Sequence, residues 1–111
     1  MRTTWALFCM GGSAIAVGMS AAVDAQDSER GRNLFASYGC YQCHGYVGQG
    51  GAAPRVVGNS YPYEAFERLV RYPANEMPAY APSVLNDETL RAIYAYVMSI
   101  PRQPRIEEIV N

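Results

Sequence analysis

Cys40-Tyr41-Gln42-Cys43-His44 is the stretch that predicts most about the fold of this chain. Two cysteines three residues apart are followed directly by a histidine, the pattern of c-type haem attachment. Residues three apart on a helical turn share a face, so both thiols can reach one porphyrin edge and form thioethers with its vinyl groups. The histidine can then bring an imidazole nitrogen to the iron. The pattern therefore predicts one covalently attached haem c.

Three other roles of a Cys-x-x-Cys pair stay open at this point: a structural zinc site, a thioredoxin-like dithiol and a simple disulfide. A zinc site takes about four protein ligands, whereas the 111 residues include three cysteines and one histidine. A dithiol of the thioredoxin kind expects a strand before the motif, but no run of β-branched residues precedes Cys40. Haem attachment is the favoured interpretation.

The N-terminus has the composition of a secretory signal. Arg2 is followed by a largely apolar stretch at residues 5–23, and Val23 and Ala25 fit the small-residue cleavage rule. We expect a signal peptide at residues 1–25, cut after Ala25 (or, second, after Ala22), and export to the periplasm. An uncleaved membrane anchor is the alternative, since the stretch is near the lower length limit of a membrane span.

The remaining residues, 26–111, form one small domain, and a domain of this size often needs a covalent or metal staple. All nine basic residues are arginine, against ten acidic residues. Because the chain has no lysine and no basic run, we expect no nucleic-acid partner.

The pattern predicts an all-α fold with three main helices, at residues 27–38, 61–72 and 86–99. Asp27 and Asn86 are the expected N-caps, and Gly39 is the expected stop of the first helix. Glycine at position 31, inside that helix, suggests close approach of another helix. The glycine-rich residues 45–58 and the proline-containing residues 74–83 are expected to be loops.

A chain with one histidine cannot ligate haem iron through two imidazoles, and a thioether is the next strong protein ligand. Met77 lies in a loop stiffened by Pro78, where helix geometry does not restrict its direction. Met98 lies in the last predicted helix, where methionine is usually core filler. We therefore predict His44 and Met77 as iron ligands, with a vacant or water-bound site as the alternative.

At these residues the chain resembles class I c-type cytochromes, in particular the small monohaem bacterial proteins often found beside periplasmic dehydrogenases. The resemblance spans residues 27–101. It rests on the Cys40–Gly45 motif, the Gly-Ala-Ala-Pro-Arg run at residues 51–55, Met77-Pro78-Ala79-Tyr80, and residues 90–97.

The resemblance implies the cytochrome c fold, wrapped around one haem, and further roles. Pro54 would offer its carbonyl to the far nitrogen of His44. Arg55 would pair with a haem propionate, or is otherwise a solvated loop arginine. The first and last helices would cross, with Gly31 and Phe35 packed against Leu90 and Tyr94.

Ligation by His44 and Met77 implies outer-sphere electron transfer rather than an enzyme, since both axial positions are filled and no catalytic base or nucleophile is evident. The expected role is a soluble periplasmic carrier or the electron-accepting subunit of a dehydrogenase, with a dehydrogenase or a terminal oxidase as redox partner. The alternative is a haem-based sensor or ligand-binding module with an open iron site. Most of the nine tyrosines are expected to pack in the haem pocket or at the surface, and a docking role for some of them is a further hypothesis.

Overall fold

The computed structural model describes residues 19–58, 61–102, 104 and 109, with side chains described from residue 26 onward. Its helices are α1 (Met19–Ser37), α2 (Cys40–His44), α3 (Tyr63–Arg71) and α4 (Asp87–Ser99). The described residues contain no strand, which confirms the all-α prediction. The predicted signal peptide lies mostly outside the described residues, so its cleavage stays a prediction.

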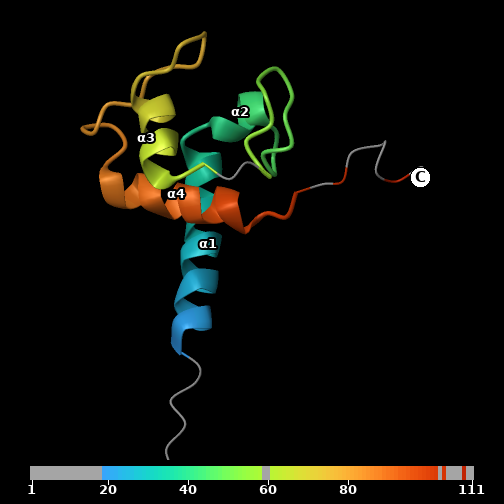
Figure 1. Ribbon diagram of the computed structural model, residues 1–111. Coiled ribbons are helices and arrows are strands. Elements are labelled where there is room, and N and C mark those ends of the chain that lie inside the picture. Colours follow the sequence, from blue (N-terminus) through green and yellow to red (C-terminus); the bar gives the residue numbers. More distant parts are fainter. Residues whose placement is uncertain (1–18, 59–60, 103, 105–108, 110–111) are drawn as a thin grey trace, which may run out of the picture.

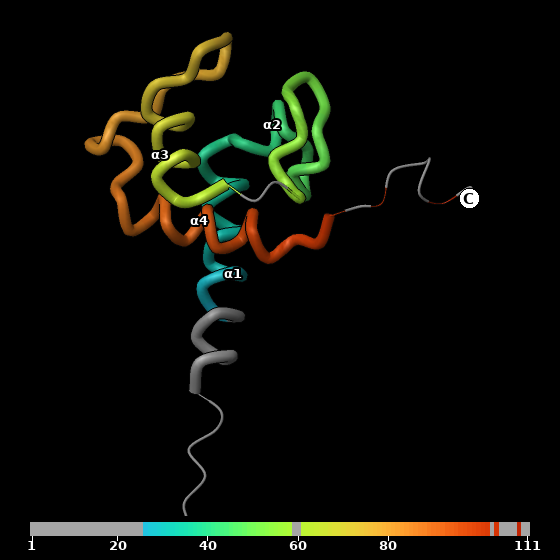
Figure 2. Tube along the Cα trace, in the orientation of Figure 1, coloured from blue at the N-terminus to red at the C-terminus, as the bar shows by residue number. Residues whose placement is uncertain are grey.

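Helices α1 and α4 cross, and the crossing is the centre of the fold (Figures 1 and 2). Gly31 is buried there. A Cβ built on it would collide with the backbone carbonyl of Ala92 and lie 2.7 Å from Cβ of Tyr96. The Phe35 ring packs edge-on against Tyr96, with ring centroids 5.6 Å apart. The close approach predicted from Gly31 is therefore present.

At this crossing Gly31 and Phe35 meet Ala92 and Tyr96. Leu90, one of the two implied contacts, lies in the same buried cluster as Phe35. Tyr94, the other, packs against rings of α3, with centroids 5.4 Å from Tyr63 and 5.3 Å from Phe66. Positions 92 and 96 share one face of the helix, because residues four apart lie one above the other.

The start of α1 also differs from the prediction. The helix begins at Met19, so Asp27 lies inside it and is not an N-cap. Residues 19–26 contain three alanines and no glycine or proline, so nothing in that stretch interrupts a helix. The other end agrees with the prediction, since Gly39 has φ +77° and separates α1 from α2.

Helix α2 was not among the three main helices predicted, and it contains the whole Cys-x-x-Cys-His motif. Helix α3 is shorter at both ends than residues 61–72, since Pro62 is its extended N-cap and Tyr72 is its non-helical C-cap. Helix α4 begins as predicted, with Asn86 Oδ1 accepting a 2.9 Å hydrogen bond from the Thr89 backbone N–H.

The core lies where α1, α3 and α4 meet. Aromatic rings make up much of it, and the Tyr94 hydroxyl donates to the Tyr61 carbonyl at 2.7 Å. Such a small helical domain has little apolar area to bury, so each of these side chains carries a large share of the stability. The buried cluster consists of Phe35, Tyr63, Val70, Leu85, Leu90, Ile93, Tyr96 and Val97.

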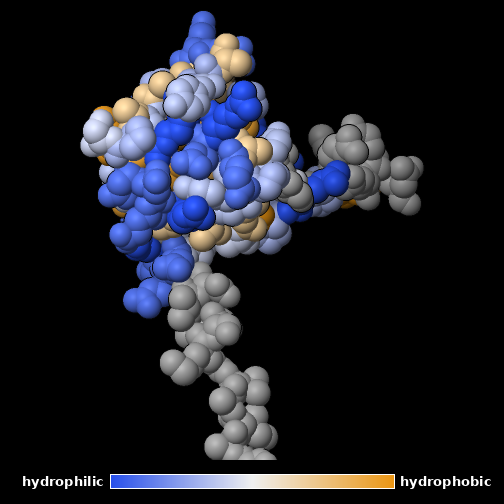
Figure 3. Space-filling model, turned by 60° about the vertical axis from the view of Figure 1, so that its left-hand side comes forward, coloured by the Kyte–Doolittle hydropathy of each residue, from blue (hydrophilic) through white to orange (hydrophobic). Residues whose placement is uncertain are grey.

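The surface in Figure 3 is mostly hydrophilic, with scattered hydrophobic residues rather than one continuous apolar face. Within the described residues, no helix is both long enough and apolar enough to cross a membrane. The predicted alternative of an uncleaved anchor concerns residues 5–23, most of which lie outside those described.

Gly31→Ala should destabilise the protein. Alanine would favour the helix by up to about 1 kcal/mol, but overpacking against a backbone carbonyl that cannot rotate away costs about 1–3 kcal/mol. We expect a net loss, measured by guanidinium unfolding of the holoprotein. Ala36→Gly, at an exposed position of the same helix, is the control for propensity alone. A more stable Gly31→Ala protein would show that the crossing can relax.

Candidate functional site

The two motif cysteines occupy one turn of α2. Cys40 is partly buried, Cys43 is exposed, and both thiols are free rather than joined in a disulfide. Burial raises the pKa of the Cys40 thiol, while a backbone hydrogen bond lowers it to a smaller extent. In the described part of the chain, no three Cys, His, Asp or Glu side chains are arranged to hold a metal ion, as the zinc alternative would require.

His44 follows in the same turn, and its ring makes one decisive contact. Its Nδ1 lies 2.7 Å from the carbonyl oxygen of Pro54. A carbonyl oxygen only accepts, so Nδ1 carries the proton and the neutral ring keeps its lone pair on Nε2. An imidazole held in this tautomer presents Nε2 to a metal, and the hydrogen bond at Nδ1 makes that nitrogen a better ligand. This donor set fits a haem iron.

The loop at residues 45–58 places Pro54 at that position by folding back onto α2. The Gly50 N–H donates to the His44 carbonyl at 2.8 Å, and the Ala53 N–H donates to the Cys43 carbonyl at 3.0 Å. Gly48 has φ +68° and lies against Val57, which is 1% exposed. The loop thus needs glycine for its backbone turns and a buried valine to hold it to the domain.

Met77 lies in the segment that joins α3 to α4, partly buried and packed against the core cluster. Three residues later, the Tyr80 hydroxyl donates to the Tyr38 carbonyl at 3.0 Å, and the two rings pack edge-on. Burial raises the pKa of Tyr80, and negative charge on Cys40 and Cys43 adds to the effect. Tyr80 therefore joins the methionine segment to the part of the chain that carries the cysteines.

Figure 1 places these parts on one side of α4. Helix α2 with its following loop, and α3 with the methionine segment, both lie on the side opposite the N-terminal end of α1. The two candidate ligands thus come from two separate segments that the crossing of α1 and α4 supports. Met98 is also partly buried, on α4 against the core, as expected of core filler.

Arg55 is exposed on the loop next to Pro54, and its pairing with a propionate stays a prediction.

The rings of Tyr41 and Tyr46 stack with centroids 4.9 Å apart, and Tyr46 is 76% exposed. A stacked aromatic pair thus lies at the motif, with Tyr41 partly buried and Tyr46 exposed.

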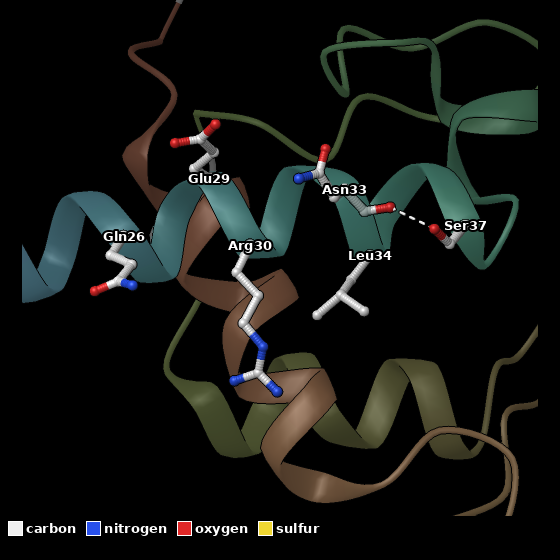
Figure 4. A pocket seen from close by; sticks show the side chains of 6 residues that line it. All are labelled: Gln26, Glu29, Arg30, Asn33, Leu34 and Ser37. Atoms are coloured by element: carbon white, nitrogen blue, oxygen red, sulfur yellow. Dashed lines mark hydrogen bonds between the residues drawn. The ribbon is translucent and has the colours of Figure 1, made fainter.

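A separate hollow of about 350 Å³ lies along α1 (Figure 4). Arg30 points from it toward α4 and forms a 2.7 Å ion pair with Glu88. Because its lining side chains come from α1 without any motif residue, and all but Leu34 are exposed, we do not regard the hollow as the functional site. Its lining residues are Gln26, Glu29, Arg30, Asn33, Leu34 and Ser37.

Sequence reasoning missed Arg71, whose side chain is only 6% exposed. It donates from Nη1 to the carbonyls of Tyr80 at 2.8 Å and Leu85 at 2.6 Å, and from Nη2 to Asp87 at 2.7 Å. In the sequence, Arg71 lies four residues after Glu67, and this spacing is typical of an exposed ion pair on a helix. The one signal in the sequence is that Arg71 directly follows Val70, a residue of the apolar stripe of this helix.

The family profile of cytochrome c oxidase, cbb3-type, subunit III matches residues 26–97. The chain belongs to this family. The match covers the motif, the Pro54 loop, the methionine segment and most of α4, so the all-α fold is that of a c-type cytochrome with a haem cofactor that serves electron transfer. No curated protein and no solved structure matches the chain.

Gly48→Ala should loosen the loop that holds Pro54 against His44. A side chain at φ +68° costs about 1–2 kcal/mol, and the new Cβ would lie 2.7 Å from Cγ1 of Val57. We expect the His44 Nδ1 proton of the reduced holoprotein to exchange with solvent about 5–30 times faster by NMR. Ala52→Ser, at an exposed position of the same loop, is the control, and equal exchange in both variants would contradict the assignment.

Proposed function

We propose that this cytochrome transfers electrons in the periplasm through one haem that Cys40 and Cys43 hold covalently and that His44 and Met77 ligate. The hydrogen bond from His44 Nδ1 to the Pro54 carbonyl carries the proposal. It gives the ring the tautomer that leaves Nε2 available to a metal.

When bound, the haem supplies a one-electron ferric–ferrous couple. The chain supplies the groups that would hold and orient the haem. Two free thiols on one turn of α2 are spaced to hold a porphyrin edge, and the Pro54 carbonyl orients the imidazole. Such fixed ligands need not rearrange when an electron arrives, which favours rapid transfer.

Met77 is the second residue that we propose would hold the iron. It is partly buried beside the core and comes from a segment that Tyr80 joins to Tyr38. A thioether favours ferrous iron and so raises the potential relative to a second imidazole. It also fills the position that oxygen, peroxide or a signalling ligand would need, and for this reason we propose a carrier rather than an enzyme or a sensor.

The proposed partner is a terminal oxidase. The family description names a cytochrome c oxidase subunit, and this favours an oxidase over the dehydrogenase that the resemblance to small class I cytochromes suggested. The stacked pair of Tyr41 and Tyr46 beside the motif would contribute apolar contact area for such docking.

Replacing both Cys40 and Cys43 by serine should abolish covalent haem attachment. Serine keeps the size of the side chain but cannot form a thioether. We expect haem staining of a denaturing gel to fall from one haem per chain to none, while each single variant keeps one link and shifts the ferrous absorption band. A stained double variant would refute covalent attachment at this motif.

Met77→Ala should remove the weak far-red band of methionine–iron ligation from the oxidised protein and lower the reduction potential. The physical reason is that water or an added ligand stabilises ferrous iron less than a thioether does. Met98→Leu is the matched control and should keep both properties. If Met77→Ala changes neither, a haem sensor with an open iron site becomes the better proposal.

A further inference from the structure

The segment that carries Met77 is fixed mainly at its C-terminal end. Tyr80 contributes three bonds there: its N–H donates to the Val70 carbonyl at 3.1 Å, its carbonyl accepts from Arg71, and its hydroxyl donates to the Tyr38 carbonyl. Met77 is only three residues away, with Pro78 between them to restrict the backbone. Whatever fixes Tyr80 therefore also limits where the thioether can lie.

Arg71 supplies several of the bonds that fix this segment. One buried guanidinium, on the last turn of α3, donates to two carbonyls of the following segment and to a carboxylate on α4. Its Nε also lies 3.9 Å from Glu67. Only arginine has several donors in a rigid fork that can bond all these groups at once.

The acceptors of Arg71 lie on both sides of the turn at residues 81–85. The Val84 and Leu85 N–H groups both donate to the Ala81 carbonyl at 2.9 Å, and the Tyr38 hydroxyl donates to the Val84 carbonyl at 3.3 Å. By donating to the carbonyls of both Tyr80 and Leu85, the Arg71 guanidinium joins the two ends of this turn. A buried positive charge is costly unless it is fully bonded, so Arg71 and the closed segment stabilise each other.

From this geometry we propose that Arg71 is a positioning residue that holds the methionine segment closed over the iron. The proposal rests on Met77 being the axial ligand. Arg71 itself touches neither haem nor iron. It acts through Tyr80, and its loss increases the fraction of molecules in which Met77 leaves the iron and an outside ligand can enter.

The test is a titration of the ferric holoprotein with imidazole, followed by loss of the methionine–iron band. An entering ligand binds only the open form, so its apparent affinity rises in proportion to the open fraction. Hydrogen bonds to a charged donor are each worth about tenfold or more in an equilibrium constant. We therefore expect Arg71→Gln to bind imidazole at least about tenfold more tightly, with Arg71→Lys between it and the wild type.

Arg30→Gln is the matched control, because Arg30 also forms a 2.7 Å ion pair with a carboxylate of α4 but does not contact the methionine segment. It should leave imidazole affinity unchanged. Wild-type affinity in Arg71→Gln would overturn the proposal. If Arg71→Gln does not fold, Arg71→Lys decides, since its charge is kept and only the fork is lost, and unchanged affinity there would likewise overturn it.

Amide hydrogen exchange at residues 79–85 of the same holoproteins separates this proposal from the proposed function. Faster exchange in Arg71→Gln, but not in Arg30→Gln, supports the role of Arg71. Unchanged exchange argues against it. A wild-type protein that lacks the methionine–iron band would instead refute ligation by Met77, whatever the exchange of this segment shows.

Discussion

The fold depends on one close crossing, where Gly31 lets α1 reach the backbone of α4 at Ala92. With any side chain at this position the two helices would separate, and Phe35 would lose its contact with Tyr96. Helix α2 follows directly from the end of α1, and the methionine segment leads directly into α4. The geometry of the crossing therefore sets the distance between the two segments that carry the candidate iron ligands.

Each of these segments is held by a different kind of interaction. The loop after α2 folds back through backbone bonds to Cys43 and His44 and uses glycines where the chain must turn sharply. The methionine segment is held by the side chains of Arg71 and Tyr80. Backbone bonds within a short loop are local, so the histidine side is set by its own neighbourhood. The methionine side depends on long-range contacts and is the easier of the two to open.

Under the proposed ligation, this asymmetry would make His44 the more firmly held ligand and Met77 the one that leaves when its segment loosens. For the proposed electron carrier a fixed ligand set is an advantage, because ligand exchange during electron transfer would slow the transfer. If the proposal for Arg71 holds, its bonds to the carbonyls of Tyr80 and Leu85 serve function as well as structure.

The sequence by itself determined the motif, the all-α class, the Asn86 cap, the stop at Gly39 and the close approach at Gly31. The cap and the stop follow from local chemistry, a side chain capping the next turn and a glycine at positive φ, and a glycine inside a helix indicates a close neighbour without saying which residue it is. The contact of His44 with Pro54 came from family resemblance, and the structure contains it. Only the tertiary structure decided that Gly31 meets Ala92 and Tyr96, and that Arg71 is buried. Both depend on how α1, α3 and α4 rotate against one another, and local sequence does not encode that rotation because many side chains far apart in the chain determine it together.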